Sequence, residues 1–293
     1  MTLLKCATHV VADLDDAVAR YGAWMDYAVV ESGVVDDGLA ALWMAPDGAG
    51  RRYALMQPAS GAQTFLRVVE GDVVEDYVPI RSYGWAAIEL CVTDVEAVNA
   101  RMMASPFEII GPPRPLDGFA IVKPMQVKGA DKEVVYLTQI LAPGAEHGLP
   151  APQSLVDRPF IMVLACPDLR AAMDWARDVL GLEVIDPVAI RYSMIAKSFD
   201  LPEGQKTEIS TGRWGDHVFL EFDQYPQGAC PRPRIEGQLP PGVAITTMEH
   251  PDFARLAPHW AVPPAMREGA LYQGRRTGML LTPEGALLEV IEA

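Results

Sequence analysis

A pattern that occurs four times limits what this chain can fold into. Each copy is an apolar run of strand type, then an aspartate, then a helical stretch. The four aspartates are Asp13, Asp94, Asp168 and Asp252. An aspartate at this point accepts hydrogen bonds from the first free amides of a helix, so each copy predicts a strand-to-helix turn. One such turn is common, whereas four in one chain indicate an internal repeat.

A second strand marker follows each aspartate and closes the unit. The markers are centred on Arg67, Tyr136, Glu221 and Glu289. They follow the four aspartates by 54, 42, 53 and 37 residues, an alternation of long and short spacings. Asp13 and Asp168 are 155 positions apart, and the other markers repeat with nearly the same offset. The sequence therefore predicts a unit that is duplicated once and contains two βαβββ modules.

The predicted fold class is α+β, in two tandem domains joined by a linker. The segment 141–159 contains several glycines and prolines and lacks periodicity, which is typical of a linker. The predicted boundaries are 1–143 for the first domain (modules about 1–75 and 80–143), 144–157 for the linker, and 158–293 for the second domain (modules about 158–228 and 240–293).

Charge and cysteine spacing exclude several classes of function. With 39 acidic and 24 basic residues, the net charge of −15 argues against nucleic acid and anionic membranes as partners. No apolar run approaches the ~18 residues of a membrane span, and the N-terminal residues do not resemble a signal peptide. The four cysteines lie far apart, which fits reduced thiols in the cytoplasm. We therefore expect a cytoplasmic protein, monomeric or homodimeric, whose partner is a small organic molecule.

The repeated module resembles the vicinal oxygen chelate superfamily. This superfamily includes glyoxalase I, the bleomycin- and fosfomycin-resistance proteins and the two-domain extradiol dioxygenases. The resemblance is carried by the four strand–Asp–helix openings, by ARDVLGLEVID at 176–186 and by LTPEGALLEVIE at 281–292. It implies that paired modules form a curved mixed sheet around a cleft. It also implies a divalent metal in that cleft, held by a first-strand histidine and a closing-strand glutamate.

The positions that correspond to these metal ligands hold other residues. The first-strand positions are Cys6, Ala87, Ile161 and Ile245, and the closing-strand positions are Arg67, Tyr136, Glu221 and Glu289. Because no first-strand histidine is present, the two-histidine, one-carboxylate site typical of such metal chemistry is missing. We therefore expect no metal; a divalent ion, if bound, would have Glu221 and Glu289 as ligands.

The resemblance places Glu221 and Glu289 in one cleft of the C-terminal domain. Two neighbouring carboxylates do not ionise independently, so the pair would act as acid and base. Strand alternation places His217 on the face of Glu221, and Thr247 and Glu249 toward the same cleft. The alternative is that these carboxylates are surface groups or pair with a core arginine, and that His217 is a polar residue at a strand start.

In the N-terminal domain, Arg67 and Tyr136 replace the acids at the matching positions. A guanidinium beside a phenol suits a carboxylate or phenolate ligand. Glu89 would face the same cleft, where it would contact substrate or neutralise Arg67 in a structural pair.

Three functions remain open. The first is an enzyme that acts on a small, partly apolar organic acid or phenolic carbonyl compound by acid–base chemistry of lyase or isomerase type. The second is a non-catalytic binding protein of the resistance type. The third is a metal-dependent dioxygenase or lyase with atypical ligands.

Overall fold

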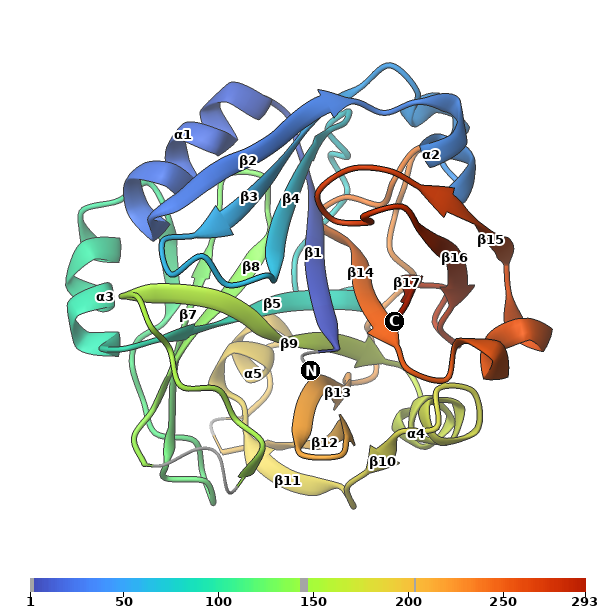
Figure 1. The fold of residues 1–293 in the computed structure, drawn as a ribbon. Helices are drawn as coiled ribbons and strands as arrows, with labels where there is room; N and C mark the ends of the chain where they lie inside the picture. The colour runs from blue at the N-terminus through green and yellow to red at the C-terminus, as the bar shows by residue number, and fades with distance from the viewer. Residues whose placement is uncertain (1–2, 143–146, 203) are drawn as a thin grey trace.

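The strands form two mixed sheets, each built from two modules (Figure 1). The computed structural model describes residues 3–142, 147–202 and 204–293, so positions 144–146 of the predicted linker lie outside it. The eight-stranded first sheet has the order β15-β16-β17-β14-β1-β4-β3-β2. Its strands are β1 (Leu4–Val11), β2 (Tyr27–Val34), β3 (Arg52–Pro58), β4 (Phe65–Glu70), β14 (Val243–His250), β15 (Val262–Arg267), β16 (Arg275–Leu281) and β17 (Leu287–Glu292).

The nine-stranded second sheet has the order β10-β12-β13-β9-β5-β8-β7-β6, with β11 paired to β12. Its strands are β5 (Gly84–Val92), β6 (Glu108–Gly111), β7 (Val122–Lys128), β8 (Val134–Ile140), β9 (Val156–Cys166), β10 (Glu183–Val184), β11 (Val188–Arg191), β12 (Lys206–Trp214) and β13 (His217–Gln224). These elements confirm the α+β class. Strand β9 starts two residues before the predicted second domain.

The four aspartates of the repeat all cap helices, as the sequence predicts. The helices are α1 (Leu14–Met25), α2 (Asp37–Leu42), α3 (Val95–Met103), α4 (Leu169–Asp178) and α5 (Ser193–Ser198), with 3₁₀ turns η1 (Pro46–Gly48) and η3 (Phe253–His259). Asp13, Asp94 and Asp168 cap α1, α3 and α4, and each accepts a hydrogen bond from an amide of the first turn. Asp252 caps η3 in the same way, so the fourth module has a 3₁₀ turn in place of an α-helix.

Replacing Asp94 with alanine should lower the free energy of unfolding by about 1 kcal/mol, the usual cost of losing an N-cap. Its carboxylate accepts from the amides of Glu96 and Ala97, which water would have to satisfy in the variant. Urea denaturation measures the loss. Asp186→Ala, which removes an exposed acid outside any helix, is the matched control and should leave the midpoint unchanged.

The modules pair across the two halves of the chain, which differs from the pairing predicted within each half. Strand β1 of the first module pairs antiparallel with β14 of the fourth, and β5 of the second pairs antiparallel with β9 of the third. Each module leaves its first strand at the edge of its own sheet, and an open edge needs a partner. The first strand of any module satisfies that need, so the repeat pattern alone does not determine which two modules join.

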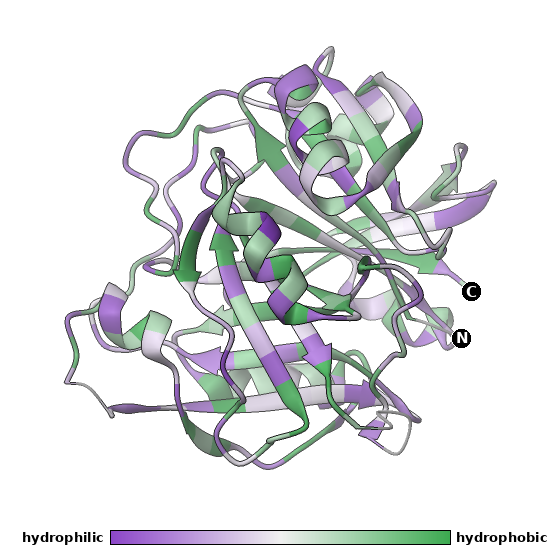
Figure 2. Cartoon of the chain, turned by 90° about the vertical axis from the view of Figure 1, so that its left-hand side faces the viewer, coloured by the Kyte–Doolittle hydropathy of each residue, from purple (hydrophilic) through white to green (hydrophobic). Residues whose placement is uncertain are grey.

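Three apolar clusters follow from this arrangement. The largest contains residues of both sheets and of α1, α3 and α4. The second covers the opposite face of the first sheet together with α2, and the third covers the opposite face of the second sheet together with α5. We call the face of the first sheet that the second cluster covers, and the face of the second sheet that the third cluster covers, the inner faces of the two sheets. Figure 2 shows hydrophobic and hydrophilic residues following one another along the strands, as expected when the two faces of a strand differ.

Candidate functional site

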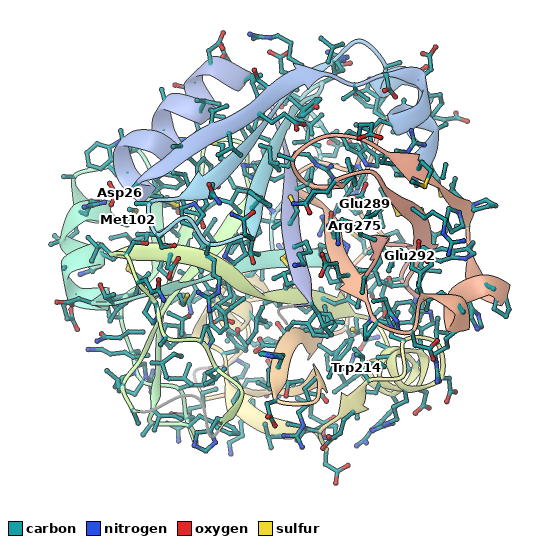
Figure 3. The ribbon with its side chains drawn as sticks, in the orientation of Figure 1. Asp26, Met102, Trp214, Arg275, Glu289 and Glu292 are labelled. Carbon is teal, nitrogen blue, oxygen red and sulfur yellow. The ribbon has the colours of Figure 1, made fainter. Side chains whose placement is uncertain are left out.

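The inner face of the first sheet holds a buried ion pair between Arg67 on β4 and Glu289 on β17. Arg67 Nη2 donates to Glu289 Oε2 at 3.1 Å, and both side chains are at most 2% exposed. The other guanidinium nitrogens donate to Thr8 Oγ1 at 2.9 Å and to the Tyr272 hydroxyl at 2.6 Å. Figure 3 shows Glu289 among the strands of the fourth module.

Four side chains donate hydrogen bonds to the Glu289 carboxylate. Besides Arg67, it accepts from Trp43 Nε1 at 2.9 Å, Tyr272 at 2.9 Å and Thr247 at 2.6 Å. The Trp43 ring, at the end of α2, lies 4.5 Å from the guanidinium carbon of Arg67. Burial alone would lower the pKa of Arg67, but Glu289 and Tyr272 hold it above its usual value. We call these five residues and Thr8 the Arg67 cluster; its charges and donors are already matched internally.

The inner face of the second sheet holds three buried carboxylates, Glu89, Glu221 and Asp223, which we call the carboxylate cluster. Glu89 lies on β5, and Glu221 and Asp223 lie two residues apart on β13. Glu89 and Asp223 are 5% and 0% exposed, and Glu221 is 8% exposed. Thr138 donates to Glu89, whereas neither oxygen of Asp223 has a hydrogen-bond partner of good geometry among the described residues.

Burial shifts the pKa of each group in the carboxylate cluster upward. Burial, with a contribution from Glu221, raises the pKa of Glu89 to about 8. Burial also raises the pKa of Glu221, although the hydrogen bond from Tyr192 opposes the shift. Burial and the neighbouring Glu221 raise the pKa of Asp223 well above its usual value. With a pKa of about 8, Glu89 retains its proton at neutral pH, and burial favours the neutral form of Glu221 and Asp223 as well.

Tyr192 connects the carboxylate cluster to a cavity. Its hydroxyl donates to Glu221 Oε1 at 3.1 Å, and its ring lies 6.3 Å from that of Tyr136. The same residue lines a cavity of about 710 Å³, which we call the rim cavity. Tyr192 directly follows β11 and precedes α5. A single residue thus lines the cavity and donates a hydrogen bond to a buried carboxylate.

The structure separates two groups that the sequence placed together. Glu221 and Glu289 lie in different sheets, because the third module pairs with the second and the fourth with the first. The prediction that they face one cleft is therefore wrong. Glu89 likewise does not neutralise Arg67, which pairs with Glu289.

Other predicted residues do come together, across the halves of the chain. Thr247 joins Glu289 in the Arg67 cluster, and Tyr136 joins Glu89 and Glu221 on the second sheet. Glu249 is buried on the first sheet, where it pairs with Lys5 at 3.0 Å and with Arg275.

His217 does not share the face of Glu221. The pairing of β12 with β13 shifts by one residue between Arg213–Val218 and Gly212–Leu220, which leaves Phe219 as an extra residue. This bulge reverses the alternation, so Val218 packs on the apolar cluster of the inner face while His217 is exposed. The predicted contact of His217 with the substrate of Glu221 is therefore wrong.

Sequence reasoning missed Asp223 and Tyr192. Asp223 had a usable signal, because a carboxylate two residues after Glu221 on a strand points to the same face. Tyr192 lies outside the strand repeat, on a connection whose path depends on tertiary packing, and no local pattern identifies it.

The residues at the metal-ligand positions of the resemblance do not fit a divalent ion. On the first sheet these positions are Cys6, Ile245, Arg67 and Glu289. The Glu289 carboxylate is already paired with the Arg67 guanidinium. Burial also raises the pKa of the Cys6 thiol to about 12, which disfavours the thiolate that metal binding needs. On the second sheet only Glu221 of the four is a carboxylate. No three His, Cys, Asp or Glu groups of the described residues are arranged to hold an ion.

Comparisons with known proteins identify the fold. No protein-family model and no curated protein sequence matches the chain. A single-site mutant of glyoxalase I from Zea mays superposes with a TM-score of 0.67 at 12% identity, covering 99% of this chain and 93% of that chain. A dioxygenase-like protein from Bacillus subtilis gives 0.62 at 12% identity, covering 99% and 85%.

A fosfomycin-resistance protein from Listeria monocytogenes, complexed with Mn(II), matches 45% of this chain and 87% of its own at 16% identity, with a TM-score of 0.31. Among the described residues, no helix is both long and apolar enough to cross a membrane. The two full-length superpositions show that the chain has the fold of this glyoxalase I and of the Bacillus subtilis protein, as the resemblance found in the four repeats predicts.

Proposed function

We propose that the protein is an enzyme that transfers a proton on a small, partly apolar organic acid or phenolic carbonyl compound at the inner face of the second sheet. The observation that carries this proposal is the position of Tyr192, which lines the rim cavity and donates to Glu221. Proton transfer needs a group whose pKa lies near the working pH, and burial moves carboxylates toward that range. Burial shifts the pKa of Glu221 upward, in the direction of this range.

The roles follow from the hydrogen bonds. Burial favours the protonated form of Asp223, whereas Glu221 accepts a hydrogen bond from Tyr192 and acts as the base. Tyr192 stands between Glu221 and the cavity, so its hydroxyl passes a proton to Glu221 as its oxygen takes one from the substrate. Return of that proton to a different substrate atom completes an isomerisation, and loss of a leaving group completes an elimination.

The Arg67 cluster has a structural role in this proposal. Each of its charged groups is paired inside the protein, and binding of a carboxylate to Arg67 would first require breaking its bond to Glu289. The chemistry proposed for the second sheet uses only groups of this chain. Removal of divalent ions with a chelator should therefore leave both turnover and thermal stability unchanged, and metal analysis of the purified protein checks this directly; a stoichiometric ion whose removal abolishes turnover would contradict it.

Replacing Glu221 with glutamine should reduce proton transfer at least 100-fold, because acid–base groups contribute about 10²–10⁴ in rate. The assay is incorporation of solvent deuterium into a panel of enolisable 2-oxo acids and hydroxyphenyl carbonyl acids in D₂O, followed by proton NMR. Tyr192→Phe should show a similar loss, since the ring stays in place while the relay is removed.

Glu96→Gln is the matched control, because Glu96 is exposed on α3 and its carboxylate pairs with Lys123. It should exchange deuterium at the wild-type rate. If the wild-type protein binds members of the panel yet exchanges none of their protons, the protein is a binding protein of the resistance type. Exchange that survives in Glu221→Gln would remove Glu221 from the mechanism.

A further inference from the structure

The rim cavity lies between the second and third modules, and Tyr192 of its lining donates a hydrogen bond to Glu221 of the carboxylate cluster. Its volume of about 710 Å³ falls within the range of small-molecule sites. One wall is the connection between β6 and β7, which carries Arg114, and the other is formed by residues of β11 and α5 with Leu201, Gly204 and Gln205. The lining residues are Arg114, Arg191, Tyr192, Ser193, Ala196, Lys197, Leu201, Gly204 and Gln205.

The charge of this lining is opposite to that of the whole chain. Acidic residues outnumber basic ones by 39 to 24, yet the described lining holds three cationic side chains and no carboxylate. Asp117 is shared between two of them, at 3.5 Å from Arg191 and 4.0 Å from Arg114. This contact ties the two walls together while leaving the cations in excess.

Lys206 is a fourth cation next to the lining, in a position that destabilises the sheet. Arg191 lies directly opposite Lys206 in the antiparallel pairing of β11 with β12. Like charges in directly opposed positions destabilise a sheet, so this arrangement works against the fold. An anion bound between the two strands and the loop would turn that repulsion into attraction.

We infer that the rim cavity binds the dianionic head group of an organic substrate, a phosphate monoester or a dicarboxylate, through Arg114, Arg191 and Lys197. This inference rests on the proposed function for the orientation of the substrate, whose apolar part would lie toward Tyr192. Arginine side chains match phosphate and carboxylate oxygens with two parallel hydrogen bonds, and local positive potential draws anions to a site on an otherwise negative protein.

Calorimetric titration with four probes tests the head group. Phenyl phosphate and phthalate carry two negative charges, benzoate carries one, and benzyl alcohol carries none. We expect one or both dianions to bind at least tenfold more tightly than benzoate, with benzyl alcohol weakest, and we expect the affinity to fall as salt is added. The stronger of the two dianions identifies phosphate or dicarboxylate as the head group. Equal binding of benzyl alcohol and the dianions would overturn the inference.

The double variant Arg191→Gln/Lys197→Gln should weaken binding of the dianions at least tenfold and leave benzyl alcohol unaffected. The matched control is Arg213→Gln/Arg177→Gln, which removes two half-exposed cations that pair with Glu183 and Asp174 away from the cavity. It makes the same change in net charge and should bind dianions as the wild type does. Equal losses in the two double variants would mean that net charge, and not the rim cavity, sets the affinity, and would overturn the inference.

The anion site and the proposed function can be tested independently of each other. Glu221→Gln should retain the affinity for phenyl phosphate and phthalate, because Glu221 lies beyond Tyr192. If dianions bind through the rim cavity but the deuterium assay shows no exchange, the anion site stands and the proposed function fails. If exchange depends on Glu221 while the Arg191/Lys197 variant binds dianions normally, the proposed function stands and the anion site fails.

Discussion

Replacing Arg67 with methionine should lower the free energy of unfolding by about 3–5 kcal/mol, the cost of leaving one partner of a buried ion pair without the other. Methionine fills a similar volume, so the loss reports the charge and its hydrogen bonds. The variant leaves Glu289 with donors from Trp43, Tyr272 and Thr247 but without a counter-ion. Urea denaturation at pH 7 measures the change.

Two further variants separate charge from packing. Arg52→Met removes an exposed arginine that pairs with Glu70 and Asp15, and should cost far less, because water screens exposed ion pairs. The double variant Arg67→Met/Glu289→Gln removes both buried charges, and should be more stable than Arg67→Met alone. If Arg67→Met costs no more than Arg52→Met, the Arg67 cluster is not an important source of stability.

Replacing Glu89 with glutamine should flatten the dependence of stability on pH between about 4.5 and 8. The pKa of Glu89 is about 8 in the folded protein and roughly 4.3 in the unfolded chain, so the folded state binds more protons in this window. Stability therefore falls as pH rises, with a slope of up to about 1.4 kcal/mol per pH unit for one such group. Glutamine does not ionise, so the variant should gain stability relative to the wild type at pH 8 compared with pH 5.

Thermal unfolding at a series of pH values shows the difference. Thr138 can still donate to the side-chain oxygen of glutamine, so the substitution keeps the local hydrogen bond. Glu96→Gln, at an exposed position, should give a curve parallel to that of the wild type. A curve for Glu89→Gln that is also parallel would mean that Glu89 is ionised in the folded protein at neutral pH.

Local features of the fold were predictable from the sequence because local physics determines them. An aspartate that caps a helix leaves a trace in a few consecutive residues, and all four predicted caps form. The closing strands lie where their apolar patterns place them, and Arg67, Tyr136, Glu221 and Glu289 all fall on β-strands.

The candidate site was less predictable because it depends on contacts between distant segments. Glu221 lies near Glu89 only because β9 pairs with β5. The sequences of the four first strands are too similar to show which strands pair. His217 was misplaced by a single extra residue in β13, which strand alternation does not reveal. The cations of the rim cavity lie on β11, on α5 and on the connection between β6 and β7, outside the repeated pattern, so their assembly depends on the tertiary structure.

The pairing of the first module with the fourth determines the order in which the two sheets can form during synthesis. Thr8 pairs with Ile245, 237 positions further along, whereas Ile88 pairs with Met162 after 74. Closing the longer loop costs only about 1 kcal/mol more. At ribosomal rates of about 5–20 residues per second, however, synthesis of the segment between Thr8 and Ile245 takes roughly 10–50 s. During synthesis the second sheet can be joined first, while β1 keeps an open edge until β14 emerges. The nascent first module is thus the part of the chain most exposed to wrong strand partners and most in need of protection by a chaperone.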